Sequence, residues 1–203
     1  MVRPSALSSL GAVLSLTACT SVLSPPATPL AMSLARGRCT IVVTRPGGDW
    51  SQWDQQLCDP PGQATAVPPP WLASVAVRAV DEAEVAACGA SRCASHKRAV
   101  RFYVVSSPAL TLTSQTDDEK IVVVLSSALV DRVGPDGGFY ELAYAHELAY
   151  LRLGATCGEG VQSDDALRDL ACDREALRWL AIEQPRDEGW TRRATILAEA
   201  RNR

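Results

Sequence analysis

The sequence feature that most constrains the fold is an apolar run at residues 120–125, followed shortly afterwards by a helical pattern at residues 139–153. The run reads KIVVVL and is apolar enough to be a central strand of a sheet. Residues 139–153 give the strongest helical pattern in the chain, and Gly154 is well placed to end that helix. A buried strand before a strong helix favours a fold that mixes sheet and helix.

The other segments extend this pattern in both directions along the chain. Their order of helix, strands and then helices predicts an α+β fold, mainly helical, with a small β-sheet preceding the helix at 139–153. We predict strands at residues 39–44, 99–106 and 111–113, and helices at 71–87, 126–133, 163–183 and 190–201.

The composition excludes several classes of protein. At 203 residues, with 47% apolar and 21% charged residues, the chain is long and apolar enough for one globular domain with a tail. Lys and Arg number 20 against 23 for Asp and Glu, and no basic block stands out, so we expect no nucleic-acid partner. No nucleophile elbow, phosphate loop or dinucleotide fingerprint is present.

The amino terminus has the proportions of an export signal. Arg3 precedes an apolar and small stretch at residues 6–18, which is too short to span a membrane. The tetrad at residues 16–19, Leu-Thr-Ala-Cys, resembles a bacterial lipobox. The resemblance implies a lipid on Cys19, membrane anchoring through that lipid, and a periplasm-facing place in the bacterial cell envelope. An ordinary secretory signal with a chance cysteine is the alternative.

This interpretation divides the chain into three parts. Residues 1–18 are expected to be the lipoprotein signal peptide, and the Ser/Pro/Ala-rich residues 19–36 a membrane tether. Residues 37–203 are expected to form the folded domain.

The cysteine count fits export to an oxidising compartment. Of seven cysteines, six remain when Cys19 is assigned to lipidation, and an even number in an exported protein suggests three disulfides. Pairing in sequential order closes the smallest loops and is the prediction. A zinc ribbon that uses His96 is the weaker alternative. The predicted pairs are Cys39–Cys58, Cys88–Cys93 and Cys157–Cys172.

The centre of the helix at 139–153 carries the one chemical motif, His146-Glu147-Leu148-Ala149-Tyr150. Zincin metallopeptidases carry H-E-x-x-H on a helix, because residues at i and i+4 share a face and two imidazoles can then hold one zinc ion. The glutamate acts as general base on the metal-bound water. Here the first His and the Glu are present, and Tyr150 stands at the second His position.

Residues 120–181 resemble the HtpX/CAAX-prenyl-protease type of membrane-associated zinc peptidase. The resemblance includes the strand and short helix at 121–130 and an acidic stretch at 169–173 that parallels an E-x-x-A-D motif. It implies a zincin-like (gluzincin-like) fold, zinc bound by His146 and Asp169, and Glu147 as the base. Asp173 stands where the motif's Asp would be. Protein or peptide near the membrane would be the substrate.

Two departures fall on metal ligands. Tyr150 replaces an imidazole with a phenol, whose pKa near 10 opposes zinc binding, and Asp169 is one methylene shorter than Glu. The chain has only two histidines, so a degenerate peptidase that acts as a binding or assembly module is the favoured interpretation. One alternative is an active zinc-dependent endopeptidase in which Tyr150 ligates the metal or stabilises an oxyanion. The other is an ordinary amphipathic helix with Glu141, Glu147 and Arg152 solvated.

Two further expectations concern cysteine and tryptophan residues. A Cys157–Cys172 disulfide would clamp the two helices that a zincin holds together with zinc; a His146–Cys157–Cys172 metal site is the alternative. Trp179 lies on an apolar helical face and is expected in the core. Trp50 and Trp53, next to a glycine turn, are expected to be exposed.

Overall fold

The computed structural model describes residues 36–61, 63, 68–89, 97–116, 119–153, 165–183 and 189–201. In this part of the chain six helices and a four-stranded sheet form the α+β fold that the sequence predicts. The elements in chain order are β1 (Cys39–Arg45), α1 (Ser51–Leu57), α2 (Leu72–Cys88), β2 (Ala99–Val105), β3 (Leu112–Thr116), β4 (Lys120–Ser126), α3 (Ser127–Val133), α4 (Gly137–Leu153), α5 (Asp165–Glu183) and α6 (Trp190–Arg201).

The sheet has the strand order β1-β2-β4-β3, so β4 lies inside it, as predicted from its apolar run. Strands β2 and β4 are parallel, with Phe102 opposite Val123, and the two outer pairings are antiparallel. Strand β3 is longer than the predicted strand at 111–113 and forms one edge of the sheet. Its position beside β4 brings it close to α4.

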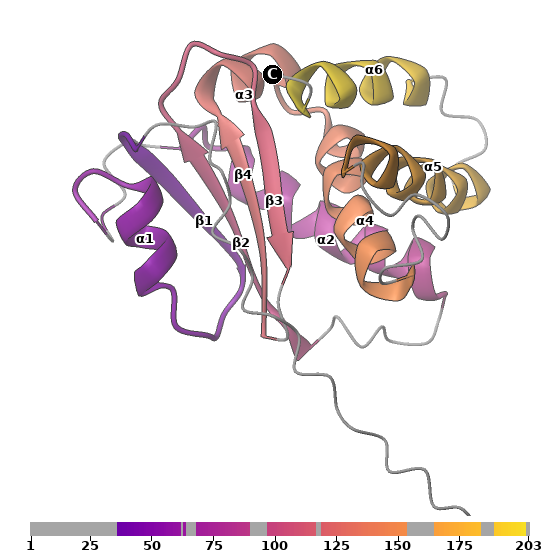
Figure 1. Ribbon diagram of the computed structural model, residues 1–203, viewed down its shortest axis with the longest axis horizontal. Helices are drawn as coiled ribbons and strands as arrows, with labels where there is room; N and C mark the ends of the chain where they lie inside the picture. The colour runs from indigo at the N-terminus through magenta and orange to yellow at the C-terminus, as the bar shows by residue number, and fades with distance from the viewer. Residues whose placement is uncertain are drawn as a thin grey trace, which may run out of the picture. The chain divides into compact units, whose positions relative to one another are not determined.

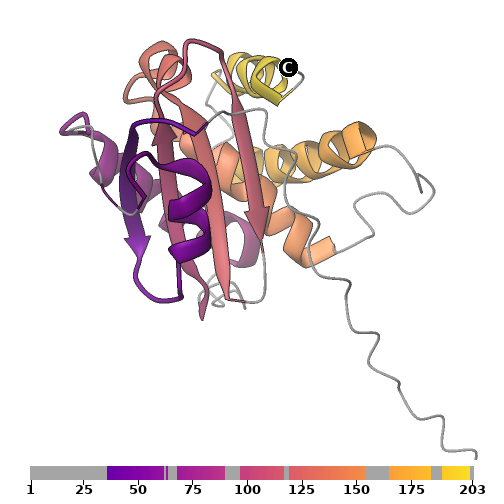
Figure 2. The same ribbon diagram turned by 60° about the vertical axis from the view of Figure 1, so that its left-hand side comes forward.

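Helices cover the two faces of the sheet unequally. In Figure 1, α2, α4, α5 and α6 lie to one side of the strands, and Figure 2 shows α1 in front of the opposite face. Alternation along β4 matches this division: Ile121, Val123 and Leu125 belong to the larger core, and Val122 and Val124 to the smaller one. Helix α4 contributes buried residues to the same larger core, so it packs on that face of the sheet.

Helix α1 was not predicted, and the exposure expected for the two nearby tryptophans is wrong. Trp50 is 4% exposed and Trp53 is 8% exposed, since both pack in the smaller core. Gly47 and Gly48 have positive φ angles, which allow the chain to turn there and bring α1 back onto the sheet. The indole of Trp50 donates a hydrogen bond to the Gly47 carbonyl oxygen at 2.5 Å. Trp179, at 4% exposure, is in the core as expected.

One predicted disulfide is confirmed directly. Cys39 and Cys58 are bonded, which links the start of β1 to the residue after α1. Cys88 and Cys172 are each disulfide-bonded as well. Their predicted partners, Cys93 and Cys157, lie outside the described residues.

Helix α4 is buried almost all round. It begins two residues earlier than predicted, and its side chains from Phe139 to Ala149 are all buried. Glu141 is 1% exposed and Glu147 is 3% exposed, so the interpretation of α4 as an ordinary helix with these two glutamates solvated is wrong. No helix in the described part of the chain combines the length and apolar character needed to cross a membrane.

Candidate functional site

Helix α4 places His146 and Glu147 in the protein interior, at 5% and 3% exposure. Consecutive residues on a helix point about 100° apart, so the two side chains reach different neighbours. His146 meets residues of α5 and α6, and Glu147 meets residues of the edge strand β3. We call His146, Glu147 and these partners the site cluster.

The imidazole of His146 is held by a carboxylate and a guanidinium. Nδ1 lies 2.8 Å from Asp173 Oδ1 and 2.9 Å from Arg201 Nη1. Arg201 Nη1 also lies 2.5 Å from the same Asp173 oxygen. The side chains of Asp173 and Arg201 are 16% and 10% exposed, so this charge pair is largely removed from water.

These contacts affect the protonation of Asp173 and the tautomer of His146. Burial alone would raise the pKa of Asp173, but the hydrogen bond from His146 and the charge of Arg201 hold that pKa below its ordinary value. An ionised carboxylate only accepts hydrogen bonds, so we assign the proton on His146 to Nδ1, which donates it to Asp173. A guanidinium also only donates, so Arg201 Nη1 then donates to Asp173 and contacts His146 Nδ1 without a hydrogen bond to it. In the neutral ring this tautomer leaves the lone pair on Nε2, which lies 3.8 Å from Glu147 Oε1.

Both carboxylate oxygens of Glu147 accept hydrogen bonds from β3. Ser114 Oγ donates to Oε1, and Thr116 Oγ1 donates to Oε2 at 2.7 Å. Residues two apart on a strand share a face, so the two hydroxyl groups approach Glu147 together. The carboxylate therefore links the edge strand to α4.

A second buried polar group on α4, the inner cluster, lies two residues before His146. Tyr144 donates a hydrogen bond to Glu84 Oε1 at 3.0 Å, and Arg45 Nη2 donates to Glu84 Oε2, also at 3.0 Å. Burial raises the pKa of Tyr144 well above its usual value, so its hydroxyl keeps its proton and acts as a donor. This cluster joins α4 to α2 and β1.

The structure describes the side chain of only one of the two other predicted ligands. Tyr150 is 38% exposed at the far end of α4, and the side chain of Asp169 lies outside the described residues. His146 itself fits a metal ligand, because metal-binding histidines usually donate their other ring N–H to a carboxylate. The described side chains include no group of three that could hold a metal, so they do not supply the ligand set that zinc requires.

The cysteine-based alternatives are wrong. Cys172 is disulfide-bonded, so it has no thiolate to offer a His146–Cys157–Cys172 metal site. Cys88 is also disulfide-bonded, which removes it from the zinc ribbon considered with His96. His96 lies outside the described residues.

Three members of the site cluster were missed by sequence reasoning. Ser114 and Thr116 lie in a polar strand with no motif, and Arg201 lies 55 residues from His146 in the sequence. Asp173 was noticed only as part of the acidic stretch that resembles a peptidase motif. Asp173 lies four residues after Asp169 and therefore on the same helix face, and this spacing could have identified it as a candidate site residue.

Comparison with known proteins adds no identification. No protein-family model, no curated protein and no solved structure matches this chain. The resemblance to zinc peptidases therefore depends on the residues of the 120–181 segment alone. The function is therefore inferred from the contacts of the site cluster.

Proposed function

We propose that this chain is a lipid-anchored protein of the bacterial cell envelope whose zinc-metallopeptidase-like, zincin-like domain is catalytically impaired and acts as a binding or assembly module. Cys19 would carry the lipid, and the partners would be proteins or peptides of the envelope. The observation that supports this best is the engagement of Glu147: both of its oxygens accept hydrogen bonds from β3. A general base needs an oxygen directed at water or substrate.

The rest of the site cluster supports the same proposal. Arg201 places a fixed positive charge 2.9 Å from the His146 ring, on the side that Asp173 occupies. Tyr150 replaces the second imidazole and is exposed. In this function the polar residues of α4 hold the edge strand and the C-terminal helix in place, and the surface they stabilise does the binding.

An active zinc-dependent endopeptidase with altered ligands is the second candidate. The hydrogen bond between His146 Nδ1 and Asp173 favours it, because that bond is typical of histidines that ligate metals. Asp169 and Tyr150 would have to supply the missing ligands.

One experiment separates the two candidates. The full chain with Cys19→Ser is purified, its zinc content is measured, and casein cleavage is compared with that of a Glu147→Gln variant. We expect less than a tenth of an equivalent of zinc and no cleavage that depends on Glu147. About one equivalent of zinc together with Glu147-dependent cleavage would establish the endopeptidase.

Two variants refine this experiment. Tyr150→His restores the second imidazole and is expected to raise zinc content if the family placement is right. Thr116→Val removes one donor to Glu147, and in an impaired enzyme it should produce no cleavage. Cleavage gained in Thr116→Val would show that the hydroxyl groups of β3 were masking a competent base.

A further inference from the structure

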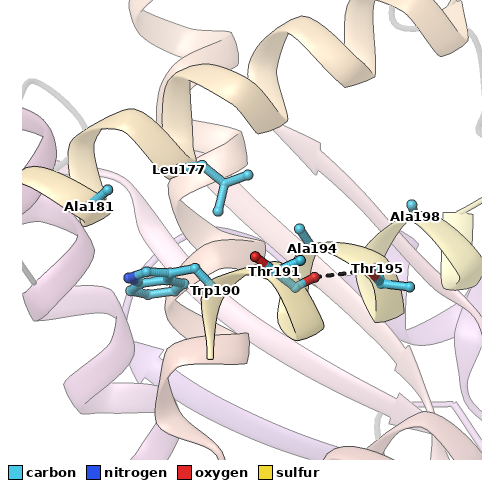
Figure 3. Close-up of a pocket in the computed structure, with 7 residues that line it drawn as sticks. All are labelled: Leu177, Ala181, Trp190, Thr191, Ala194, Thr195 and Ala198. Carbon is cyan, nitrogen blue, oxygen red and sulfur yellow. Dashed lines mark hydrogen bonds between the residues drawn. The ribbon is translucent and has the colours of Figure 1, made fainter. Parts of the chain in front are cut away.

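Helices α5 and α6 enclose an open apolar groove of about 570 Å³ at the surface of the protein. Figure 3 shows the two helices contributing from opposite sides, with Trp190 at one end and Ala198 at the other. Most of the lining residues are exposed or half-buried, so the groove opens to solvent. The lining residues of this α5–α6 groove are Leu177, Ala181, Trp190, Thr191, Ala194, Thr195 and Ala198.

The site cluster joins the two helices just beyond the Ala198 end of the groove. Asp173 belongs to α5 and Arg201 to α6, and Arg201 Nη1 lies 2.5 Å from Asp173 Oδ1. Both side chains are largely buried, so this ion pair fixes the end of α6 beside the start of α5. The contacts that hold His146 therefore also set the separation of the two walls of the groove.

The walls of the groove suit a helix better than an extended peptide. Ala194 and Ala198 are four residues apart on α6 and have no atoms beyond Cβ, so a second backbone can approach this face closely. The Thr195 hydroxyl already donates to the Thr191 carbonyl oxygen at 2.9 Å. An extended peptide brings backbone donors and acceptors that need partners, whereas a helix bonds its own backbone. From Trp190 to Ala198 the groove runs for about 12 Å, which is about two turns of a docked helix.

The side chains along the outer side of the groove are basic. Arg174 and Arg178 lie three residues before Leu177 and Ala181 on α5, so each arginine is one turn from a lining residue. Arg192 lies in the first turn of α6, beside the other wall. All three arginines are exposed. They place positive charge on both sides of the apolar lining.

The nearby acidic side chains do not cancel this charge. Glu175 accepts a hydrogen bond from Arg178 Nε at 2.8 Å, and Glu199 lies 2.9 Å from Arg132. Within the described residues, Arg174 and Arg192 form no ion pair. An excess of positive charge therefore remains beside the groove. A second copy of the same surface would bring the same excess and be repelled, whereas an acidic partner would be attracted.

We propose that the α5–α6 groove binds an amphipathic helix of a protein partner, with small apolar residues against the alanines of α6 and acidic residues beside Arg174 and Arg192. Docked helices of this kind contact a groove through apolar residues at i, i+3, i+4 and i+7. Leu170 is 44% exposed and lies seven residues before Leu177, so it extends the apolar face of α5 beyond the groove. This proposal rests on the proposed function, because it names the surface and the partner class of the same binding module.

A displayed peptide library lets the protein select the charge of its partner. Helical peptides of about four turns carry Ala, Val or Leu at i, i+3, i+4 and i+7, and Glu or Lys in equal proportion on the flanks of that face. They are selected against the full chain carrying Cys19→Ser. We expect Glu to exceed Lys by at least about threefold on the flanks of the selected peptides. Their Kd, measured by fluorescence anisotropy, should rise as salt is added.

Variants of the groove decide whether it is the binding site. Ala198→Leu places a larger side chain in the groove and should raise Kd at least about tenfold, whereas Ala73→Leu, at an exposed position of α2, should leave Kd unchanged. Arg174→Glu combined with Arg192→Glu should reverse the selection toward Lys, and Lys97→Glu, exposed before β2, should not. The two charge substitutions are at exposed positions, so they remain informative if Ala198→Leu does not fold.

Three results would overturn the proposal: no peptide selected, no preference for Glu, or the same Kd in Ala198→Leu as in the parent chain. A dimer of the parent chain that Ala198→Leu dissociates would make the groove a self-association surface and would also overturn it. None of these results changes zinc content or casein cleavage. Failure of the groove without zinc or cleavage would leave the proposed function in place with a different binding surface, whereas zinc with Glu147-dependent cleavage would contradict the proposed function itself.

Discussion

Helix α4 carries two buried polar clusters that differ in what they hold together. The inner cluster of Tyr144, Glu84 and Arg45 joins α4 to α2 and β1 inside the larger core. The site cluster around His146 and Glu147 joins α4 to the edge strand β3 and to the C-terminal helices. In both clusters the buried charges are hydrogen-bonded to neighbouring charged or polar groups, so a buried charge on this helix does not by itself indicate catalysis. The two clusters differ in the elements that they connect to α4: α2 and the edge strand β1 for the inner cluster, and the opposite edge strand β3 with α5 and α6 for the site cluster.

The largest effect is expected in the inner cluster. Glu84→Ala leaves the Arg45 guanidinium, whose side chain is 17% exposed, without its carboxylate, and it removes the acceptor of Tyr144. Removing one partner of a buried ion pair costs about 3–5 kcal/mol, so we expect a loss of that size in the free energy of unfolding measured with urea. A loss below about 1 kcal/mol would mean that this cluster is not a structural centre of the core.

A smaller effect is expected at the C-terminal helix. Arg201→Ala leaves Asp173 with His146 as its remaining partner, and hydrogen bonds to charged groups contribute about 1.5–3 kcal/mol. We expect the free energy of unfolding to fall by about that amount. Arg192→Ala, at an exposed position of the same helix, is the matched control and should change it by less than about 0.5 kcal/mol. Equal changes in the free energy of unfolding for the two variants would mean that the contacts of Arg201 with the site cluster do not stabilise the fold.

The elements of the fold differ in how well the sequence predicts them. Local patterns predicted α6 at its observed bounds, the interior position of β4, and α4 to within two residues at its start. They could not predict α1, because seven residues without a clear apolar repeat give little signal, and its two tryptophans were assigned to the surface. Long-range packing, not local periodicity, forms that helix.

The site shows the same division. His146 and Glu147 were found because they are adjacent in a motif whose spacing has a chemical reason. Arg201, Ser114 and Thr116 were missed, because each reaches the site through the fold from more than 30 residues away. The inner cluster was missed entirely, since Glu84 lies 60 residues from Tyr144. A sequence motif can show which residues of a helix have catalytic or ligand side chains. It cannot show which distant residues the fold will bring into contact with them.

A contribution to stability that is lost only at low pH is expected from Asp173. Its pKa is lower in the folded protein than the ordinary value of about 3.9, so the unfolded chain binds the proton more readily. The contribution of Asp173 is therefore complete above about pH 4 and is lost as the pH falls toward its folded pKa. Asp173→Asn should be less stable than the parent at neutral pH, with a gap that narrows on acidification. Unfolding free energies measured across this range test it, with Asp131→Asn at an exposed position as control.

The smallest effect is expected at Tyr150, and it tests the site most directly. This side chain is 38% exposed and lies one helical turn beyond His146. If it were a metal ligand or an oxyanion donor, Tyr150→Phe would remove an oxygen on which zinc content or cleavage depends. In a binding module the phenol contributes only surface packing. We therefore expect a change in the free energy of unfolding within about 0.5 kcal/mol and no change in zinc content. If Tyr150→Phe lost bound zinc, the phenol would be a metal ligand and the site cluster would be a functional metal centre, even though Glu147 is hydrogen-bonded to β3.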